Sequence, residues 1–450
     1  MNVEFLNDFG VNNDCAYINH SDFNTKISYF NNKFSIFHLN INSVVANFDS
    51  LIHFLSIINY KFSVIVLTES KLDNSCDKLF NISGYNHISL NRNRHGGGIR
   101  LYYLCHLTVN ICSDLSMVSD ICEMLVAQIS LNDNLLLKVA CIYRPPSSSK
   151  RLFLEFIGGK LDRGFLSHSN TILIGDLNID FLEKSSINRE LYDYLFSKSF
   201  KILITIPTYI HSIKSYPSSC LDQIAINSSI NCDSFVFNYK ITDHLPIICI
   251  LNIKYDDTLN TIKFRNFSSK NINNFLKDCD DIYDDMPTDF SNHDVNTATR
   301  MFTTYCIKIS NKYFPLLSKQ IGIKRIKSPW LCKSAIKCLD LKCKIYNRCK
   351  IINDDAFWEI YFLFDKLLKL LLKRSKDHYY RNFFNKNKKS SKKTWDKIND
   401  LISSGKNRHS KFQIVNEGEV VTSSYEVANL FNNYFLNIPV ELLSKLPQSD

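Results

Sequence analysis

Several features that would mark a membrane, secreted or zinc-binding protein are missing from this 450-residue sequence. Its start, MNVEFLNDFG, is acidic and has no apolar core, so no secretory signal is expected. The most apolar stretch, residues 357–372, is interrupted by charged residues and predicts no membrane span. None of the fifteen cysteines forms a C-x-x-C pair, which favours reduced buried thiols over zinc sites or disulfides. These absences predict an intracellular protein that is not secreted.

Positive charge is concentrated in the second half of the chain. Residues 1–250 hold 20 Lys and Arg against 22 Asp and Glu, whereas residues 251–450 hold 34 against 22. Within that half, residues 301–400 alone carry a net charge of +16. A charge run of this kind is often no more than a solvated face, but an excess this one-sided predicts contact with a polyanion, usually nucleic acid.

Composition and apolar periodicity divide the sequence into five segments. Residues 1–30 are polar, lack clear periodicity and are expected to form a flexible tail. In residues 31–254, short apolar runs alternate with helix-like segments, which predicts an α/β domain of two packed β-sheets flanked by helices, a four-layered sandwich. A polar linker (255–300) and a basic, mostly helical connector (301–405) follow, and residues 406–450 return to neutral charge.

Polar side chains stand near the ends of the predicted strands. Six short segments carry them: HLN with Asn40, LTES with Glu69, YRPP with Tyr143, GDLNID with Asp176 and Asn178, CLDQI with Asp222, and TDHLPI with Asp243 and His244. Each alone has a plainer explanation, such as a helix cap at Glu69 or a satisfied core histidine at His244. Polar groups beside apolar strands are costly unless they meet in a shared cleft, so six together predict one site.

The residue types predict a hard cation and phosphodiester chemistry. Carboxylates and an amide oxygen suit Mg²⁺ or Mn²⁺ rather than zinc or copper. In such a site a metal neutralises charge on the phosphate, a carboxylate orients or deprotonates water, and a histidine donates to a non-bridging oxygen. The set therefore predicts a metal-dependent hydrolase that cuts phosphodiester bonds.

The ordered motifs HLN, LTES, RHGGGI, YRPP, GDLNID, CLDQI and TDH resemble those of the endonuclease/exonuclease/phosphatase superfamily. That family includes apurinic endonucleases, deoxyribonuclease I and some lipid phosphodiesterases. YRPP, GDLNID and RHGGGI together look most like the endonuclease of LINE-type non-LTR retrotransposons, of the chicken-repeat and jockey-like kinds. The resemblance covers residues 31–254 and implies a DNA nick that leaves a 3′-hydroxyl to prime reverse transcription.

The resemblance also implies roles for the metal and for the attacking water. Glu69 would hold the metal, with Asn40 and Asp243 completing or supporting its shell. Asp176 would position and deprotonate the water, and Asn178 would fix water and phosphate beside it.

The remaining motif positions would serve the phosphate. His244 would hydrogen-bond the scissile phosphate, and Asp222 would orient its imidazole and favour its charged form. Tyr143 would donate its hydroxyl to the phosphate or help to place the carboxylate that activates water. Thr242 would give a supporting polar contact.

Two positions depart from the pattern of the family. Gln223 follows Asp222 where such elements often show His, which alters hydrogen bonding around the site and removes no catalytic group. Arg100 stands after GGGI, where small or apolar residues are usual.

The run His95-Gly96-Gly97-Gly98 lacks the ending of a phosphate-binding loop and predicts a glycine-rich turn that enters a strand.

The basic half resembles another part of the same elements. Residues 327–402 look like the connector between endonuclease and reverse transcriptase in LINE-type proteins, and EVANLFNNYFLNI (426–438) looks like the segment before the polymerase fingers. No polymerase catalytic motif is present, so no reverse transcriptase activity is expected. The basic residues of 301–400, interleaved with aromatic ones, are candidates for contact with element RNA. KKSSKK (388–393) is a candidate nuclear-targeting patch.

The favoured function is therefore a Mg²⁺-dependent DNA endonuclease of a LINE-type element, acting in the nucleus. A first alternative is an apurinic-repair-type nuclease or a small-substrate phosphodiesterase of the same superfamily, although the basic extension argues against a small substrate. A second is an inactive nucleic-acid-binding transposon relic, although every core catalytic position still carries a competent residue.

Overall fold

The computed structural model describes residues 15–58, 60–76, 79–132, 135–164, 170–211, 217–227, 230–254, 261–284, 293–320, 329–352, 354–402, 414–416, 419–421 and 424–444. The chain forms two compact units, residues 1–404 and residues 405–450. Within the described residues, no helix combines the length and the apolar character needed to cross a lipid bilayer.

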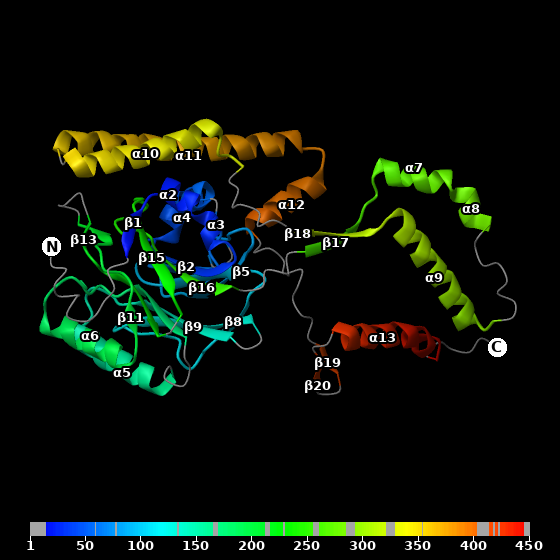
Figure 1. The fold of residues 1–450 in the computed structure, drawn as a ribbon, viewed down its shortest axis with the longest axis horizontal. Helices are drawn as coiled ribbons and strands as arrows, with labels where there is room; N and C mark the ends of the chain where they lie inside the picture. The colour runs from blue at the N-terminus through cyan, green and yellow to red at the C-terminus, as the bar shows by residue number, and fades with distance from the viewer. Residues whose placement is uncertain are drawn as a thin grey trace. The chain divides into compact units, whose positions relative to one another are not determined.

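A mixed seven-stranded sheet forms one layer of the first unit (Figure 1). In spatial order its strands are β1 (Ala16–Ile18), β15 (Cys232–Phe237), β16 (Ile247–Lys254), β2 (Lys33–Asn40), β3 (Val64–Thr68), β5 (Ile99–Leu104) and β4 (Tyr85–Leu90). Both β2 and β3 are buried along their whole length, and β3 is accordingly apolar up to its last residue, Thr68. Because β2 and β3 run parallel with Asn40 opposite Thr68, their carboxyl ends lie at the same edge.

The second sheet is also mixed and has seven strands. In spatial order they are β11 (Lys201–Ile202), β14 (Asp222–Asn227), β10 (Thr171–Asp176), β9 (Leu135–Tyr143), β8 (Glu123–Asn132) and β6 (Thr108–Ile111), with β7 (Met117–Val118) paired to the start of β8. The central strand β10 is parallel to β9 and antiparallel to β14. This register sets Asp176 directly between Tyr143 and Asp222.

The two sheets pack together, because β10 contacts both β2 and β3. Helices α2 (His20–Thr25), α3 (Ile27–Phe30) and α4 (Val44–Ile57) lie on the first sheet, and α5 (Lys150–Gly164) and α6 (Ser186–Ser197) lie on the second (Figure 1). Phe54 of α4 packs its ring on Phe37 and Phe237. This arrangement confirms the predicted four-layered α/β sandwich.

Part of the segment expected to be a flexible tail is folded. Strand β1 pairs in parallel with β15, and the ring of Phe23 is fully buried and stacked on Phe30. The polar composition of residues 1–30 hides these few apolar side chains, whose burial against the first sheet is sufficient to order residues 15–30.

The glycine-rich turn before β5 is present as expected. Gly97 and Gly98 have φ angles of +70° and +90°, a region that only glycine enters without strain. A short hairpin of β12 (Tyr209–Ile210) and β13 (Pro217–Ser219) lies beside the edge where the strands of both sheets end.

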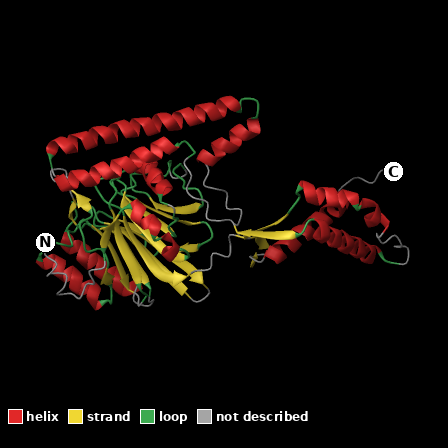
Figure 2. Ribbon diagram, turned by 45° about the horizontal axis from the view of Figure 1, so that its top comes forward, coloured by secondary structure: helices red, strands yellow, loops and turns green. Residues whose placement is uncertain are grey.

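The basic region is mainly helical, as predicted (Figure 2). Its elements are β17 (Thr261–Arg265), α7 (Ser269–Lys277), α8 (Cys279–Asp284), α9 (Val295–Tyr313), β18 (Leu316–Gln320), α10 (Lys333–Ile352), α11 (Asp355–Lys386) and α12 (Ser391–Ile402). The unit of residues 405–450 holds the hairpin of β19 (Ile414–Asn416) and β20 (Glu419–Val421) and helix α13 (Ser424–Ser444). The predicted segment boundaries stay predictions.

Helices α10 and α11 pack on each other and share the hydrophobic core of the first unit. Tyr346 of α10 and Trp358 of α11 are buried and in ring contact. Polar contacts join the pair to the sandwich: Lys376 Nζ lies 2.6 Å from Asp49 Oδ1 on α4, and Lys342 Nζ donates to the carbonyl of Lys240 at 3.3 Å.

Candidate active site

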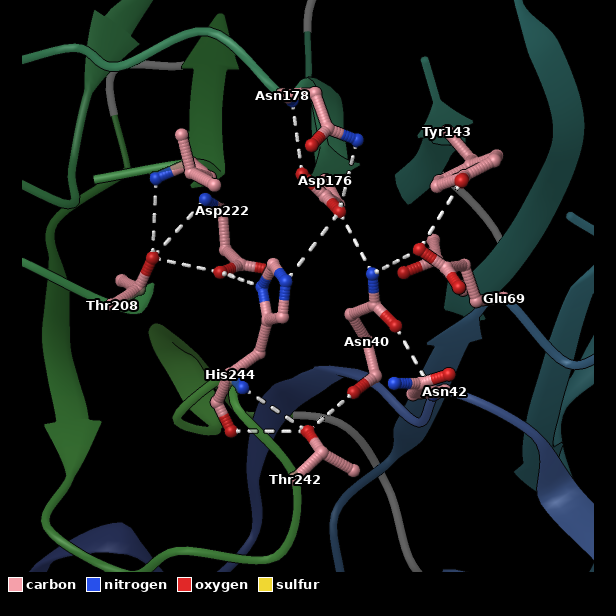
Figure 3. Close-up of polar contacts among 12 residues, drawn as sticks. Asn40, Asn42, Glu69, Tyr143, Asp176, Asn178, Thr208, Asp222, Thr242 and His244 are labelled. Atoms are coloured by element: carbon pink, nitrogen blue, oxygen red, sulfur yellow. Dashed lines mark hydrogen bonds and ion pairs between the residues drawn. The ribbon is translucent and has the colours of Figure 1, made fainter. Parts of the chain in front are cut away.

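Polar side chains from both sheets meet where β2, β3, β9 and β10 end (Figure 3). Strands β9 and β10 bring Tyr143 and Asp176 side by side. Strand β2 contributes Asn40, whose amide Nδ2 donates to Asp176 Oδ2 at 2.8 Å and to Glu69 Oε1 at 3.0 Å. Asn40 therefore links the two carboxylates across the interface of the sheets.

A buried histidine connects two of the aspartates (Figure 3). The Nδ1 atom of His244 donates to Asp222 Oδ2 at 2.8 Å, and its Nε2 atom lies 3.9 Å from Asp176 Oδ2. The hydroxyl of Thr208 donates to the same Asp222 oxygen at 2.7 Å. The side chains of Asp176, Asp222 and His244 are all buried, so their charges interact strongly.

Asp176 is held by fixed donors. The backbone N–H of Asn178 donates to Oδ1 at 2.9 Å, and the Asn178 side-chain amide donates to Oδ2 at 3.3 Å and to the carbonyl of Arg144 at 2.7 Å. The guanidinium of Arg144 in turn donates to the carbonyls of Leu177 and Asn178 at 2.6 and 2.7 Å. The turn after β10 is thereby fixed around the carboxylate.

The electrostatics of the cluster push its pKa values apart. Burial raises the pKa of Asp176 to about 7, against the opposing effect of the nearby His244. Burial alone would lower the pKa of His244, but the carboxylates of Asp222 and Asp176 raise it to about 10. Burial alone would raise the pKa of Asp222, but the charge and hydrogen bond of His244 lower it. At neutral pH the ring is therefore a cation, and Asp176 is poised to exchange a proton.

Glu69 lies on the other side of Asn40. Its Oε1 accepts a hydrogen bond from the Tyr143 hydroxyl at 3.1 Å, and its Oε2 lies 3.0 Å from Lys71 Nζ, which also donates to Asn42 Oδ1 at 2.6 Å. Burial would raise the pKa of Glu69, but the hydrogen bonds from Asn40 and Lys71 lower it. Glu69 is therefore a carboxylate at neutral pH.

Backbone strain is gathered at this edge. Of the eight described non-glycine residues with positive φ, five follow β2, β3 or β10: Asn42, Ser43, Glu69, Lys71 and Asn178. Such conformations cost about 1–3 kcal/mol each and persist where the surrounding structure holds them. Here the backbone N–H groups of Ser43, Ser70 and Lys71 are all hydrogen-bonded to carbonyls of neighbouring loops.

The donor set fits a hard cation. Glu69 and Asn40 offer oxygen atoms beside each other. Asp243 offers a buried Oδ1 that has no hydrogen-bond partner among the described residues. An orphaned buried carboxylate oxygen is costly unless a cation or donor meets it. Asp176, Asp222 and His244 also bring one ligand atom each within 4.8 Å of one another. His244 is the weaker ligand, because a protonated ring has no free lone pair.

The structure brings eight of the nine predicted site residues into one network of contacts. Thr242 accepts a hydrogen bond from the backbone N–H of His244 at 3.1 Å and donates to the carbonyl of Asn40 at 2.8 Å. Asp243 is the exception, because among the described residues its side chain makes no hydrogen bond or ion pair with the others, although its carbonyl accepts from Ile210.

Three contributors were not predicted from the sequence. His38, buried in HLN, places Nδ1 3.7 Å from Asp222 Oδ1, and burial lowers its pKa to about 4. Lys71 lies two residues after Glu69, just outside the LTES motif, and pairs with it. Thr208 follows no motif, and only the fold reveals that its hydroxyl faces Asp222.

The two departures from the motif pattern have structural explanations. Gln223 points away from the site and binds the backbone N–H and carbonyl of Ile204, both at 2.9 Å. Arg100 is fully buried, donates to the Phe80 carbonyl at 3.1 Å and lies over the ring of Tyr102. Both polar side chains therefore satisfy backbone or aromatic groups within the sheets.

Comparison with known proteins finds similarity in three-dimensional structure alone. No protein-family model matches the chain, and no curated protein matches its sequence. Among solved structures, the chain is similar to the endonuclease domain of TRAS1, a telomere-specific non-LTR retrotransposon. The identity is 14% and the TM-score 0.38, and the match covers 49% of this chain and 99% of that one. It is also similar to the 3′-5′ exonuclease NExo from Neisseria meningitidis (14% identity, TM-score 0.38) and to an AP endonuclease from Archaeoglobus fulgidus (15% identity, TM-score 0.38), each covering 49% of this chain and 100% of the other.

Proposed function

We propose that this chain is a metal-dependent phosphodiesterase that cuts the backbone of DNA. The observation that carries the proposal is the buried pair of Asp176 and His244, a carboxylate with a raised pKa beside an imidazolium. Hydrolysis of a phosphodiester needs a base for the attacking water and a donor for the phosphate, and this pair supplies both.

Asp176 is the base in this proposal. Its Oδ2 accepts the proton of the attacking water, while the Asn178 N–H and the Asn40 amide fix the orientation of the carboxylate. A base works best when its pKa lies near the working pH, and a pKa of about 7 meets that condition. The water oxygen bonds to phosphorus as the bond to the 3′ oxygen breaks.

His244 stabilises the charge that develops on the phosphate. Its Nε2–H is free to donate to a non-bridging oxygen because its Nδ1–H is engaged by Asp222. Thr208 holds Asp222 in turn, so the direction of the ring is fixed before substrate arrives. The Tyr143 hydroxyl is a second donor for the phosphate, on the side of Glu69.

Glu69, Asn40 and Asp243 are the residues that would hold Mg²⁺ or Mn²⁺. When bound, such an ion neutralises charge on the phosphate and on the leaving oxygen. Lys71 Nζ now pairs with Glu69 Oε2 and Asn42, so a positive charge already balances the carboxylate.

The finer part of the proposal rests on the motif resemblance. In this finer proposal the chain is the endonuclease of a LINE-type retrotransposon, and it nicks target DNA in the nucleus to leave a 3′-hydroxyl. It also binds element RNA through the basic residues 301–400. The net charge of +16 in that region supports a nucleic-acid partner.

Nicking of supercoiled plasmid by the purified chain tests the proposal. With Mg²⁺ we expect open-circular product whose 3′ ends are extended by a DNA polymerase without prior treatment. EDTA and Asp176→Ala are each expected to abolish the product. A folded chain that retards DNA in gels but makes no nick would reverse the catalytic assignment. Preference for an abasic over an intact duplex would instead indicate a repair-type nuclease.

A further inference from the structure

The junction of α11 and α12 carries a dense, uncompensated positive charge. We call residues 386–397 the elbow; it holds six lysines and one aspartate, a net charge of +5. Five of these lysines are exposed and take part in no ion pair within the described part of the chain: Lys386, Lys388, Lys389, Lys392 and Lys393. Elsewhere in the helical region lysines are neutralised, since Lys342 of α10 and Lys369 of α11 both pair with Asp365. The positive charge of the elbow is therefore largely left without acidic neighbours among the described residues.

A large aromatic side chain stands within this charge. Trp395 of α12 is 62% exposed, whereas the buried Trp358 of α11 is 4% exposed. Lys392 lies one helical turn before Trp395 on the same face of α12. An exposed indole among lysines is the combination that stacks on an unpaired base while the cations meet phosphates.

The other aromatic residues near the elbow are already engaged. Tyr379 and Tyr380 pack on Trp330 with ring centroids at 6.4 and 5.8 Å, and Lys397 lies over the ring of Phe383 at 5.8 Å. These three rings therefore have contacts within the chain. Trp395, in contrast, is largely exposed.

A hollow on the last turns of α11 adjoins the elbow. It measures about 450 Å³, and its described lining consists of Asp377, Tyr380, Arg381, Phe384 and Asn385. Arg381 offers a guanidinium to phosphate, and Asn385 offers both a donor and an acceptor to the edge of a base.

From this arrangement we infer that the elbow is a binding site for single-stranded nucleic acid, with one base stacked on Trp395 and the phosphates on the five lysines. A single strand fits better than a duplex, because an indole reaches the face of a base only where that base is unpaired. The inference deepens the proposed function by giving its nucleic-acid partner a place on the chain, and its test is independent of catalysis.

Tryptophan fluorescence of the full chain in EDTA provides the test. Oligouridylate and oligothymidylate, ten nucleotides long, are titrated separately, which separates RNA from DNA as the source of the strand. We expect quenching on binding, with affinity falling as salt rises at a logarithmic slope of about −3.5 for five phosphate contacts on a single strand. We expect Trp395→Leu to remove the quenching and to weaken binding about tenfold by fluorescence anisotropy of labelled oligonucleotide.

Matched variants separate stacking from charge and from catalysis. Trp358→Phe, which alters a buried indole, is expected to leave the binding-dependent quenching in place. Asp176→Ala is expected to bind oligonucleotide as the parent chain does even where it has lost nicking, so failure of the proposed function would leave this result unchanged. Equal affinity for heparin without quenching, or equal oligonucleotide affinity in Trp395→Leu, would overturn the inference and leave a general polyanion surface.

Discussion

His244 lies between two carboxylates, with Nδ1 2.8 Å from Asp222 Oδ2 and Nε2 3.9 Å from Asp176 Oδ2. The shorter contact is a charge-assisted hydrogen bond, and the longer one leaves the Nε2–H without a close acceptor. The ring is therefore anchored on one side and available on the other. The same two carboxylates raise the pKa of His244, so anchoring and charging of the ring have one cause.

The pH dependence of nicking follows from these shifts. Activity requires Asp176 ionised and His244 protonated, so kcat/KM is expected to rise through pH 7 and to fall near pH 10. In Asp222→Asn the main support of the imidazolium is lost, so the alkaline limb is expected to move by more than one pH unit toward acid. An alkaline limb that stays in place in Asp222→Asn would show that His244 is not the group that titrates there.

Asp176→Asn is expected to abolish nicking and to remove a loss of stability that the parent chain suffers as the pH rises through 7. The pKa of Asp176 is raised to about 7 in the folded chain from an ordinary 3.8, so its contribution to stability is full below pH 3.8 and is lost as pH rises through 7. Asparagine avoids this loss because it carries no charge to bury. The amide of the variant cannot accept all the hydrogen bonds that the two carboxylate oxygens receive, and this cost is the same at every pH. Thermal unfolding should therefore show a difference in Tm between variant and parent that shifts by several degrees in favour of the variant from pH 5 to pH 8. A difference that stays constant over this range would contradict the assignment.

Thr208 tests whether the outer contact of the cluster matters for catalysis. Thr208→Val removes the hydroxyl that donates to Asp222 and that accepts from the backbone N–H groups of Leu221 and Asp222. We expect kcat to fall about tenfold with little change in KM, because the lost contact orients the ring and does not touch substrate. Thr208→Ser keeps the hydroxyl and should restore most of the rate. If valine and serine behave alike, the hydroxyl has no part in positioning.

The strand ends that carry the site were predictable because their apolar runs end in polar residues. Asn40, Tyr143 and Asp176 each occupy the last position of a strand. The parallel register of β9 and β10 sets Tyr143 beside Asp176, and the packing of the two sheets brings Asn40 to them. Thr208 was not predictable, because it lies in a loop whose path depends on the hairpin of β12 and β13. The folding of residues 15–30 was also missed, because it depends on surface supplied by β15, two hundred residues later in the chain.

Gly97 supports the loop that carries Glu69. Its carbonyl accepts a hydrogen bond from the backbone N–H of Lys71. Its φ angle is +70°, and a Cβ added there would lie 2.0 Å from the buried Glu123 Oε1. Gly97→Ala is expected to cost more than about 2 kcal/mol of unfolding free energy and to lower activity. Gly96→Ala is the matched control: its Cβ would meet nothing within 4 Å, so the change should stay within about 0.5 kcal/mol. Urea unfolding measures both, and equal effects would contradict the steric account.

The helical pair α10–α11 is expected to stabilise the sandwich. Leu339, Tyr346, Trp358 and Tyr361 belong to the hydrophobic core shared with the two sheets. A fragment of residues 1–254 should therefore unfold at a Tm several degrees below that of a fragment of residues 1–402, since it loses buried side chains worth about 3 kcal/mol or more.

A double-mutant cycle isolates one contact of this interface. Asp49 on α4 and Lys376 on α11 form a half-exposed ion pair at 2.6 Å, so Asp49→Ala and Lys376→Ala should show a coupling energy of about 0.5 kcal/mol, reduced at high salt. Arg151 and Glu155, an exposed pair within α5, provide a control cycle that the loss of α10–α11 should leave unchanged. If the shorter fragment is as stable as the longer one, the packing of α10–α11 on the sandwich contributes nothing to its stability, and the ion pair should then show no coupling.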